Sequence, residues 1–269
     1  MTEYSIYQVD AFATEIFKGN PAAVMPLDDW LDAAIMQQIA LENNLSETAF
    51  FVPVPGHEAD FHLRWFTPAA EVDLCGHATL AAAHVVINEG DWPGDKVIFS
   101  TEKAGILRVC RQRNGMLQLD FPAREGREIP LTDEVSTALL ARPDRLLLAR
   151  DHMAVFTTEA EVAALEPDMA RLARLNEVGV IVTAPADDPD IDFVSRFFAP
   201  FHGIPEDPVT GSAHCTLIPY WAERLGKTCL SARQISVRAG DLTCGYLADK
   251  ARVTIAGHAV TYLKGRIFL

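Results

Sequence analysis

The chain repeats itself over a long distance. Residues 64–68 (RWFTP) match residues 196–200 (RFFAP) at an offset of 132 positions. Residues 75–78 (CGHA) match residues 210–213 (TGSA) at an offset of 135, so the loop between the two motifs has three more residues in the second copy. A repeat of this length is a domain rather than a solenoid module. The sequence therefore predicts two similar domains that arose by duplication.

The order of the predicted elements agrees with a duplication. In each half, two apolar strands precede a loop and a helix, at residues 48–54, 61–66 and 76–89 and again at residues 178–184, 192–198 and 211–225. Asp28 or Asp29 is expected to cap an earlier helix, and residues 159–175 show a further helical pattern. Gly90 is expected to close the helix at residues 76–89, and most other segments are strand-like.

These elements predict an α+β protein of two β-rich domains. Residues 1–120 form the first domain, with strands at about 245–269 expected to complete it, and residues 121–244 form the second. In each domain a loop leads into a helix, and we expect the two loops to face one cleft.

The composition narrows the class of function. The net charge is −14 and the chain has no long cluster of lysine and arginine, so nucleic acid is a poor partner. No run of 18 apolar residues is present, so we expect no membrane span. The start of the chain lacks the pattern of a signal peptide, and the five cysteines show no CxxC spacing. We therefore expect a cytoplasmic protein with reduced thiols.

The two repeated loops are candidate anion sites. A helix start offers unpaired N–H groups and a partial positive charge, and Gly76 and Gly211 let a ligand approach the backbone closely. For either loop alone, ordinary capping is the simpler interpretation. The two loops together, in register with the repeat, favour binding of a small carboxylate.

Glu47 is the strongest candidate for proton transfer. It stands at the entry to an apolar strand, and the corresponding residue of the repeat is Gly179, so the carboxylate occurs in one half only. A carboxylate in apolar surroundings is suited to take and return a proton near neutral pH. The alternative is a solvent-facing glutamate at the end of a strand.

Asp207 and His77 are the next candidates. Asp207 lies in the loop that the second half enlarged, and it either caps the helix start or points into the cleft. His77 lies in the first turn of its helix, where it could donate to an oxyanion, although a structural role is commoner. No metal or cofactor is expected, because His77 and His84 are about 10 Å apart along a helix and no GxGxxG or Walker motif occurs.

The motifs in combination resemble the PhzF-like (phenazine biosynthesis) family. The residues that match its pattern are, in order, 10–12 (DAF), 19–24 (GNPAAV), 44–48 (NLSET), 75–80 (CGHATL) and 206–213 (EDPVTGSA). The resemblance implies the diaminopimelate-epimerase-like fold, in which two pseudo-symmetric β-barrel-like domains each surround a central helix.

The resemblance also implies a function. It assigns the general acid/base to Glu47, with His77 and Asp207 assisting. The residues expected to contact substrate are Gly76, Gly211, Ser212, Asn20 and Cys75. It implies a cofactor-free isomerase acting on a small anionic metabolite, and a homodimer. The namesake enzymes shift a proton from C3 to C1 of trans-2,3-dihydro-3-hydroxyanthranilate.

Two other functions stay open. Related epimerases use one cysteine in each loop, but Thr210 stands where the partner of Cys75 would be, so an epimerase here would need Glu47 or Asp207 in place of the second thiol. A non-catalytic binding protein is the second alternative, and the presence of Glu47, His77 and Asp207 together argues against it.

Overall fold

The structure is a computed structural model that describes residues 1–54, 56, 58–175 and 179–269. The chain folds into two compact units. Unit 1 consists of residues 1–120 and 256–269, and unit 2 consists of residues 121–255. Each unit contains both strands and helices, so the predicted α+β class is confirmed.

Unit 1 is built on a mixed sheet. Its strands are β1 Glu3–Ala11, β2 Asn20–Pro26, β3 Glu47–Pro53, β4 Phe61–Phe66, β5 Glu71–Val72, β6 Lys96–Ser100, β7 Ile106–Arg111, β8 Leu117–Pro122 and β18 Ala259–Phe268. β1 pairs antiparallel with β18 and β2, and β4 pairs antiparallel with β3 and β5. The β2–β3 and β4–β6 pairs are parallel. Antiparallel pairs join β6 to β7 and β7 to β8.

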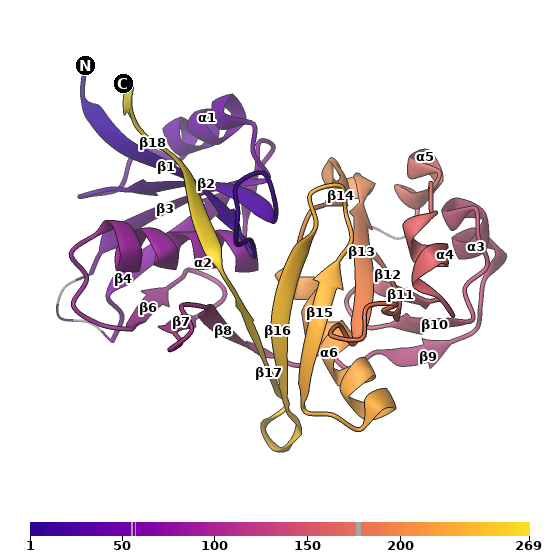
Figure 1. Cartoon of the computed structure of the whole chain (residues 1–269). Helices are drawn as coiled ribbons and strands as arrows, with labels where there is room; N and C mark the ends of the chain where they lie inside the picture. Colours follow the sequence, from indigo (N-terminus) through magenta and orange to yellow (C-terminus); the bar gives the residue numbers. More distant parts are fainter. Residues whose placement is uncertain (55, 57, 176–178) are drawn as a thin grey trace. The chain divides into compact units, whose positions relative to one another are not determined.

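Two helices pack on this sheet (Figure 1). Helix α2, Gly76–His84, is buried from His77 to His84 and packs against β1, β2 and β3, so it is the central helix of unit 1. Helix α1, Ala33–Asn43, lies on a separate apolar cluster with β2, β3 and β4, whose largest members include Met25, Met36 and Phe50. The small side chains of α2, mostly alanine, allow the strands to approach it closely.

Unit 2 contains the strands β9 Arg127–Ile129, β10 Arg145–Leu148, β11 His152–Val155, β12 Val180–Pro185, β13 Phe193–Ala199, β14 Ile204–Asp207, β15 Cys229–Gln234 and β16 Gly240–Leu247, and most of β17 Arg252–Gly257. β10 pairs antiparallel with β9 and β11, and β13 pairs antiparallel with β12 and β14. The β11–β12 and β13–β15 pairs are parallel, and β15 and β16 are antiparallel.

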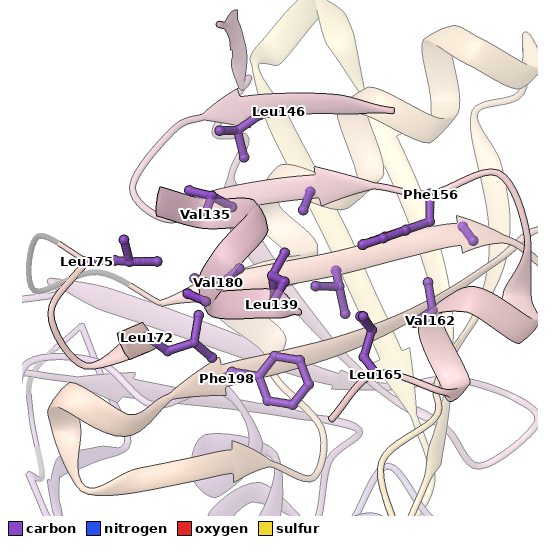
Figure 2. Close-up of a cluster of buried hydrophobic side chains, with 14 of the residues drawn as sticks. Val135, Leu139, Leu146, Phe156, Val162, Leu165, Leu172, Leu175, Val180 and Phe198 are labelled. Carbon is purple, nitrogen blue, oxygen red and sulfur yellow. The ribbon is translucent and has the colours of Figure 1, made fainter. Parts of the chain in front are cut away.

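The helices of unit 2 form two groups. Helix α6, Gly211–Leu225, is largely buried and packs against β15 and β16. Helices α3 Asp133–Leu139, α4 Glu159–Ala163 and α5 Met169–Leu172 cover a cluster of buried side chains on β10 to β13. Figure 2 shows this cluster, with Leu139, Phe156 and Phe198 pointing into it.

The two units share one topology, which confirms the predicted pseudo-symmetry of the fold. The pairing order β18–β1–β2–β3–β4–β6–β7 of unit 1 recurs as β9–β10–β11–β12–β13–β15–β16 in unit 2, with the same strand directions. Thr48 pairs with Phe66, and Val180 pairs with Phe198, at the predicted offset of 132.

An arginine–glutamate pair is repeated as well. Arg64 makes two hydrogen bonds to the carboxylate of Glu71, and Arg196 makes two to Glu206. Each guanidinium also lies over a phenylalanine ring, 5.2 Å from the centroid of Phe66 for Arg64 and 4.9 Å from the centroid of Phe198 for Arg196. The repeat visible in the sequence therefore preserves three-dimensional contacts.

Several element boundaries differ from the sequence predictions. The cap of α1 is Asp32, whose carboxylate accepts from the Ala34 N–H, rather than Asp28 or Asp29. The helix expected at residues 159–175 is two short helices, because Pro167 lies between α4 and α5 and disfavours helical geometry at the residue before it.

Two further differences concern a helix and two strands. The helix expected at residues 76–89 is α-helical only to His84 and continues as the π-helical turn Val85–Glu89. β10 and β11 were not predicted, since each has only four residues and too little pattern to recognise. Val178, with which a strand was predicted to begin, lies outside the described residues.

Among the described helices, none is long and apolar enough to cross a membrane.

Candidate active site

Glu47 is the first residue of β3, where the strand begins beside the start of β2. The residue is 8% exposed. Its Oε2 atom is buried and accepts no hydrogen bond of good geometry from any described residue, although His77 Nε2 lies 3.0 Å away. A buried carboxylate oxygen in this state is costly, so it makes Glu47 a candidate for a functional role.

His77 links this carboxylate to two other polar side chains. The amide nitrogen of Asn20 lies 3.1 Å from His77 Nδ1, and the Ser46 hydroxyl donates to the amide oxygen of Asn20. With the amide in this orientation, Nδ1 accepts and the ring proton lies on Nε2, toward Glu47. Rotation of the amide would instead present its oxygen to a protonated Nδ1, with the Ser46 hydroxyl able to accept from the amide nitrogen. The Asn20–Ser46 pair can therefore form hydrogen bonds with His77 in either protonation state of the ring.

The charges in this cluster are coupled. Burial lowers the pKa of His77, but negative charge on Cys75 and Glu47, with the close polar contacts of the ring to both side chains, outweighs burial and raises the pKa well above 6.5. Burial, and then the charge of Glu47, raises the pKa of Cys75 to about 11, so this sulfur is a thiol at neutral pH. The carboxylate of Glu47 is therefore the group that stabilises an imidazolium at His77.

Glu47, Cys75 and His77 place three potential metal ligands within 4.8 Å of one another. Their approach to the imidazole differs, however. The sulfur of Cys75 lies 3.5 Å from Nδ1 and 4.0 Å from Nε2, whereas Glu47 faces Nε2. Tetrahedral coordination needs one imidazole nitrogen and the other ligands around a single point. This arrangement is suited to proton transfer rather than to metal coordination.

The second cluster lies in unit 2, around Asp207 at the end of β14. The Thr210 hydroxyl donates to Asp207 Oδ2, which fixes the carboxylate in the loop before α6. Gln234 holds the same loop from β15: its Oε1 accepts from the Thr210 N–H at 2.8 Å, and its amide nitrogen donates to the Asp207 carbonyl at 2.7 Å. Asp207 is 8% exposed and Gln234 is fully buried.

The two helix starts share a polar arrangement. The N-cap residues Cys75 and Thr210 make no side-chain hydrogen bond to the first turn of α2 or α6. Each N-cap carbonyl instead accepts from a side chain one turn later, Thr79 Oγ1 in unit 1 and His214 Nδ1 in unit 2. The N-cap side chains thus leave the first-turn N–H groups, at Gly76–His77 and Gly211–Ser212, without a capping side chain.

The structure also explains why only one unit has the carboxylate. Gly179 occupies the position of Glu47 in the repeat. A Cβ atom on Gly179 would lie 2.2 Å from the nearest ring atom of Phe197 and 3.0 Å from the Asp151 carboxylate. The Gly179 N–H already donates to that carboxylate. Unit 2 therefore has no space for a glutamate at this position.

The structure places the residues predicted from sequence in two groups. Glu47, His77, Cys75, Asn20 and Gly76 lie together in unit 1, and Asp207, Gly211 and Ser212 lie together in unit 2. Sequence reasoning missed Ser46, Gln234 and His214. The sequence offers a signal only for Ser46, which belongs to the same NLSET motif as Glu47.

Comparison with known proteins identifies the family to which the chain is similar. Residues 9–265 match the family model described as phenazine biosynthesis-like protein. An uncharacterized isomerase of Pseudomonas aeruginosa is 51% identical over 99% of both chains. A phenazine biosynthesis-like domain-containing protein of Homo sapiens is 37% identical, over 97% of this chain and 98% of the relative.

Solved structures show the same fold. A PhzF-family crystal structure from Enterococcus faecalis superposes with a TM-score of 0.93 at 47% identity, covering 100% of both chains. A hydroxyproline epimerase from Agrobacterium vitis shares the fold at a TM-score of 0.64 and 14% identity, over 98% of this chain and 92% of the epimerase. The names of the relatives and this epimerase-like fold support an isomerase or epimerase. The chain belongs to the phenazine biosynthesis-like (PhzC-PhzF) family.

Proposed function

We propose that this chain is a cofactor-independent isomerase that moves a proton between two carbons of a small carboxylate-bearing metabolite. Glu47 is the general base and then the general acid. The observation that supports this most directly is the buried Oε2 atom, which lacks a well-formed hydrogen bond among the described residues and lies beside His77. An oxygen whose contact with the neighbouring imidazole is not a well-formed hydrogen bond keeps a lone pair with which it can take a proton from a ligand.

The proposed reaction is balanced within the substrate. Glu47 removes a proton from a carbon next to an electron-withdrawing group, and the electron pair delocalises into the substrate. The protonated Glu47 then returns the proton to the other end of the delocalised system, so the carboxylate is regenerated. An imidazolium at His77 stabilises the Glu47 carboxylate before the proton is taken up and, through Nε2–H, can donate to negative charge that develops on the substrate.

The group that binds the substrate carboxylate is proposed to include the helix starts. The backbone N–H groups at Gly76 and at Gly211–Ser212 lack a side-chain cap, and a helix start favours an anion. Asp207 is held in place by Thr210 and Gln234, an arrangement suited to orienting a substrate by hydrogen bonds. We assign Asp207 an assisting role for this reason.

The test is turnover by Glu47→Gln. Purified protein is incubated with a library of small carboxylate metabolites in D2O, and proton NMR follows isomerisation and deuterium uptake. On a substrate that the wild type converts, Glu47→Gln is expected to lower kcat by roughly 100-fold or more. Glu42→Gln is the matched control, because Glu42 is exposed on α1 and should leave kcat unchanged.

The competing assignments give different results. If Glu47→Gln kept a near-wild-type kcat and Asp207→Asn lost turnover, the role of general base and acid would belong to Asp207. An epimerase would exchange the proton at one stereocentre with loss of chirality and no shift of a double bond. In that mechanism Cys75→Ser is expected to abolish turnover, whereas the proposed mechanism expects partial activity, since Cys75 is a thiol at neutral pH. A wild type that binds library members without converting any would favour the non-catalytic alternative.

Two further expectations come from the cysteine content and from the family resemblance. The five cysteines are free, which supports the proposal of a reducing cytoplasm. The proposed homodimer is tested by light scattering of the purified chain, where the mass of a monomer at micromolar concentration would reject it.

A further inference from the structure

Unit 1 contains a cavity at the end of its central helix remote from Glu47. The cavity has a volume of about 830 Å³, and its lining includes Val85 and Val86 of the π-helical turn that follows α2, and Gly90, the C-cap of that turn. His77, beside Glu47, lies in the first turn of the same helix, about 12 Å along the helix axis from Val85. The cavity is therefore distinct from the candidate active site, and its size is that of a small-molecule pocket.

The walls of this cavity are rich in aromatic side chains. Trp30, Trp92, Tyr4 and Phe61 line it, and each is only partly buried. Trp92 packs against Phe61 with ring centroids 5.5 Å apart, and its indole N–H donates to the Lys96 carbonyl. These contacts fix the indole in place before any ligand arrives. Fixed aromatic faces bind both apolar groups and organic cations.

The charge around the cavity is negative. Asp28, Asp29 and Asp91 line it and are exposed, and no described lysine, arginine or histidine forms an ion pair with any of them. The other two acidic residues of the lining are already paired, Glu3 with Arg266 and Glu89 with Lys264. Three negative charges therefore remain beside the aromatic walls.

The C-terminal end of the helix also favours a cation over an anion or a neutral ligand. The last carbonyls of a helix bear partial negative charge and attract cations. A Cβ atom on Gly90 would lie 2.9 Å from the Val86 carbonyl oxygen, so this position of the lining requires glycine for the close approach of its own backbone. π-helical turns within helices are frequent at functional sites.

We propose that this cavity binds an organic monocation with an aromatic or alkyl body, such as a quaternary ammonium or an arylalkylammonium ion. The aromatic side chains of the wall pack against the apolar body of the cation, and Asp28 and Asp91 neutralise its charge. A simple metal ion would leave the aromatic walls unused.

The test uses benzyltrimethylammonium as the probe, with calorimetry on the full-length wild type at 0.15 M salt. Benzyl alcohol is the neutral control, and tetramethylammonium is the control without an aromatic body. The probe is expected to bind saturably and more tightly than either control. Asp28→Asn with Asp91→Asn should weaken the probe by roughly tenfold, and Trp92→Leu by roughly fivefold. Asp249→Asn with Asp190→Asn, which removes two exposed carboxylates of unit 2, is the charge-matched control and should change nothing.

Four results would overturn the proposal. Benzyl alcohol binding as tightly as the cation would show that charge is not recognised. Unchanged affinity in the doubly substituted Asp28/Asp91 variant would place the probe elsewhere, and loss of binding in Glu47→Gln would place it at the candidate active site. If the probe bound only to a monomer and dissociated a dimer, the occupant of the cavity would be a second copy of this chain. Circular dichroism of each variant confirms that a loss of affinity is not a loss of folding.

Discussion

His77 Nε2 lies 3.0 Å from Glu47 Oε2, and both side chains are almost fully enclosed. Thirty positions separate the two residues in the chain, and the pair forms because β3 and α2 begin at the same end of unit 1. The Glu47 carboxylate and the His77 imidazole, whose pKa is raised, are therefore two neighbouring groups that can each hold a proton.

The first prediction concerns the pH dependence of stability. The pKa of His77 is raised by folding, so its contribution to the free energy of unfolding is fully present below pH 6.5 and is lost as the pH rises through the folded pKa. His77→Gln should therefore reduce stability most at acidic to neutral pH and least at high pH. Urea unfolding of both proteins at pH 6 and pH 9 measures this. A stability difference that grows toward pH 9 would contradict the assignment.

The second prediction concerns His214, which is fully buried. Burial lowers its pKa to about 4, although a hydrogen bond to the Thr210 carbonyl opposes the shift. The unfolded chain then binds one more proton than the folded chain between pH 6.5 and pH 4. Stability should fall by about 3 kcal/mol from this group over that range, since each pKa unit corresponds to about 1.4 kcal/mol.

The matched variant for this test is His214→Thr, because Thr79 holds the corresponding N-cap carbonyl in unit 1. The variant should be less stable than wild type at pH 7, since it leaves a cavity. Its loss of stability between pH 6.5 and pH 4 should nevertheless be smaller. Equal losses of stability in the two proteins would show that another group, such as His152, causes most of the destabilisation at acidic pH.

The third prediction concerns Gln234. Gln234→Leu would leave the Thr210 N–H and the Asp207 carbonyl without the partners that they have in the wild type. We expect a loss of about 2 kcal/mol or more in the free energy of unfolding and a lower kcat, because the Asp207 loop is no longer held. Gln37→Leu is the control. It also removes an amide that donates to two carbonyls, those of Thr67 and Pro68, but Gln37 belongs to unit 1 rather than to the Asp207 loop. It should reduce stability and leave kcat unchanged.

The fourth prediction concerns Gly179, the counterpart of Glu47. Gly179→Ala should destabilise the protein by about 1–3 kcal/mol, because the new methyl group meets the Phe197 ring. Gly94→Ala is the control, since a Cβ there meets its nearest atom at 3.6 Å, an ordinary contact. Thermal unfolding of the two variants compares them. Equal stabilities would mean that Phe197 moves aside without cost.

The sequence by itself determined the duplication and the ends of the elements that bear the site. Helix α6 begins at Gly211 and β4 ends at Phe66 as predicted, because apolar periodicity and the glycine and proline signals that bound it are local properties of the chain. Glu47 at the start of β3 could be found for the same reason, and because Gly179 breaks the repeat at that position.

Only the tertiary structure decided which polar groups meet. Asn20 reaches His77 across 57 positions, and Gln234 reaches Thr210 across 24, through contacts between separate strands and helices. Such partners have no period and no fixed spacing in the sequence, because a buried polar group needs only a partner close in space. The same holds for the cap of α1, where Asp28, Asp29 and Asp32 are chemically equal and the position at which the helix packs on the sheet selected Asp32.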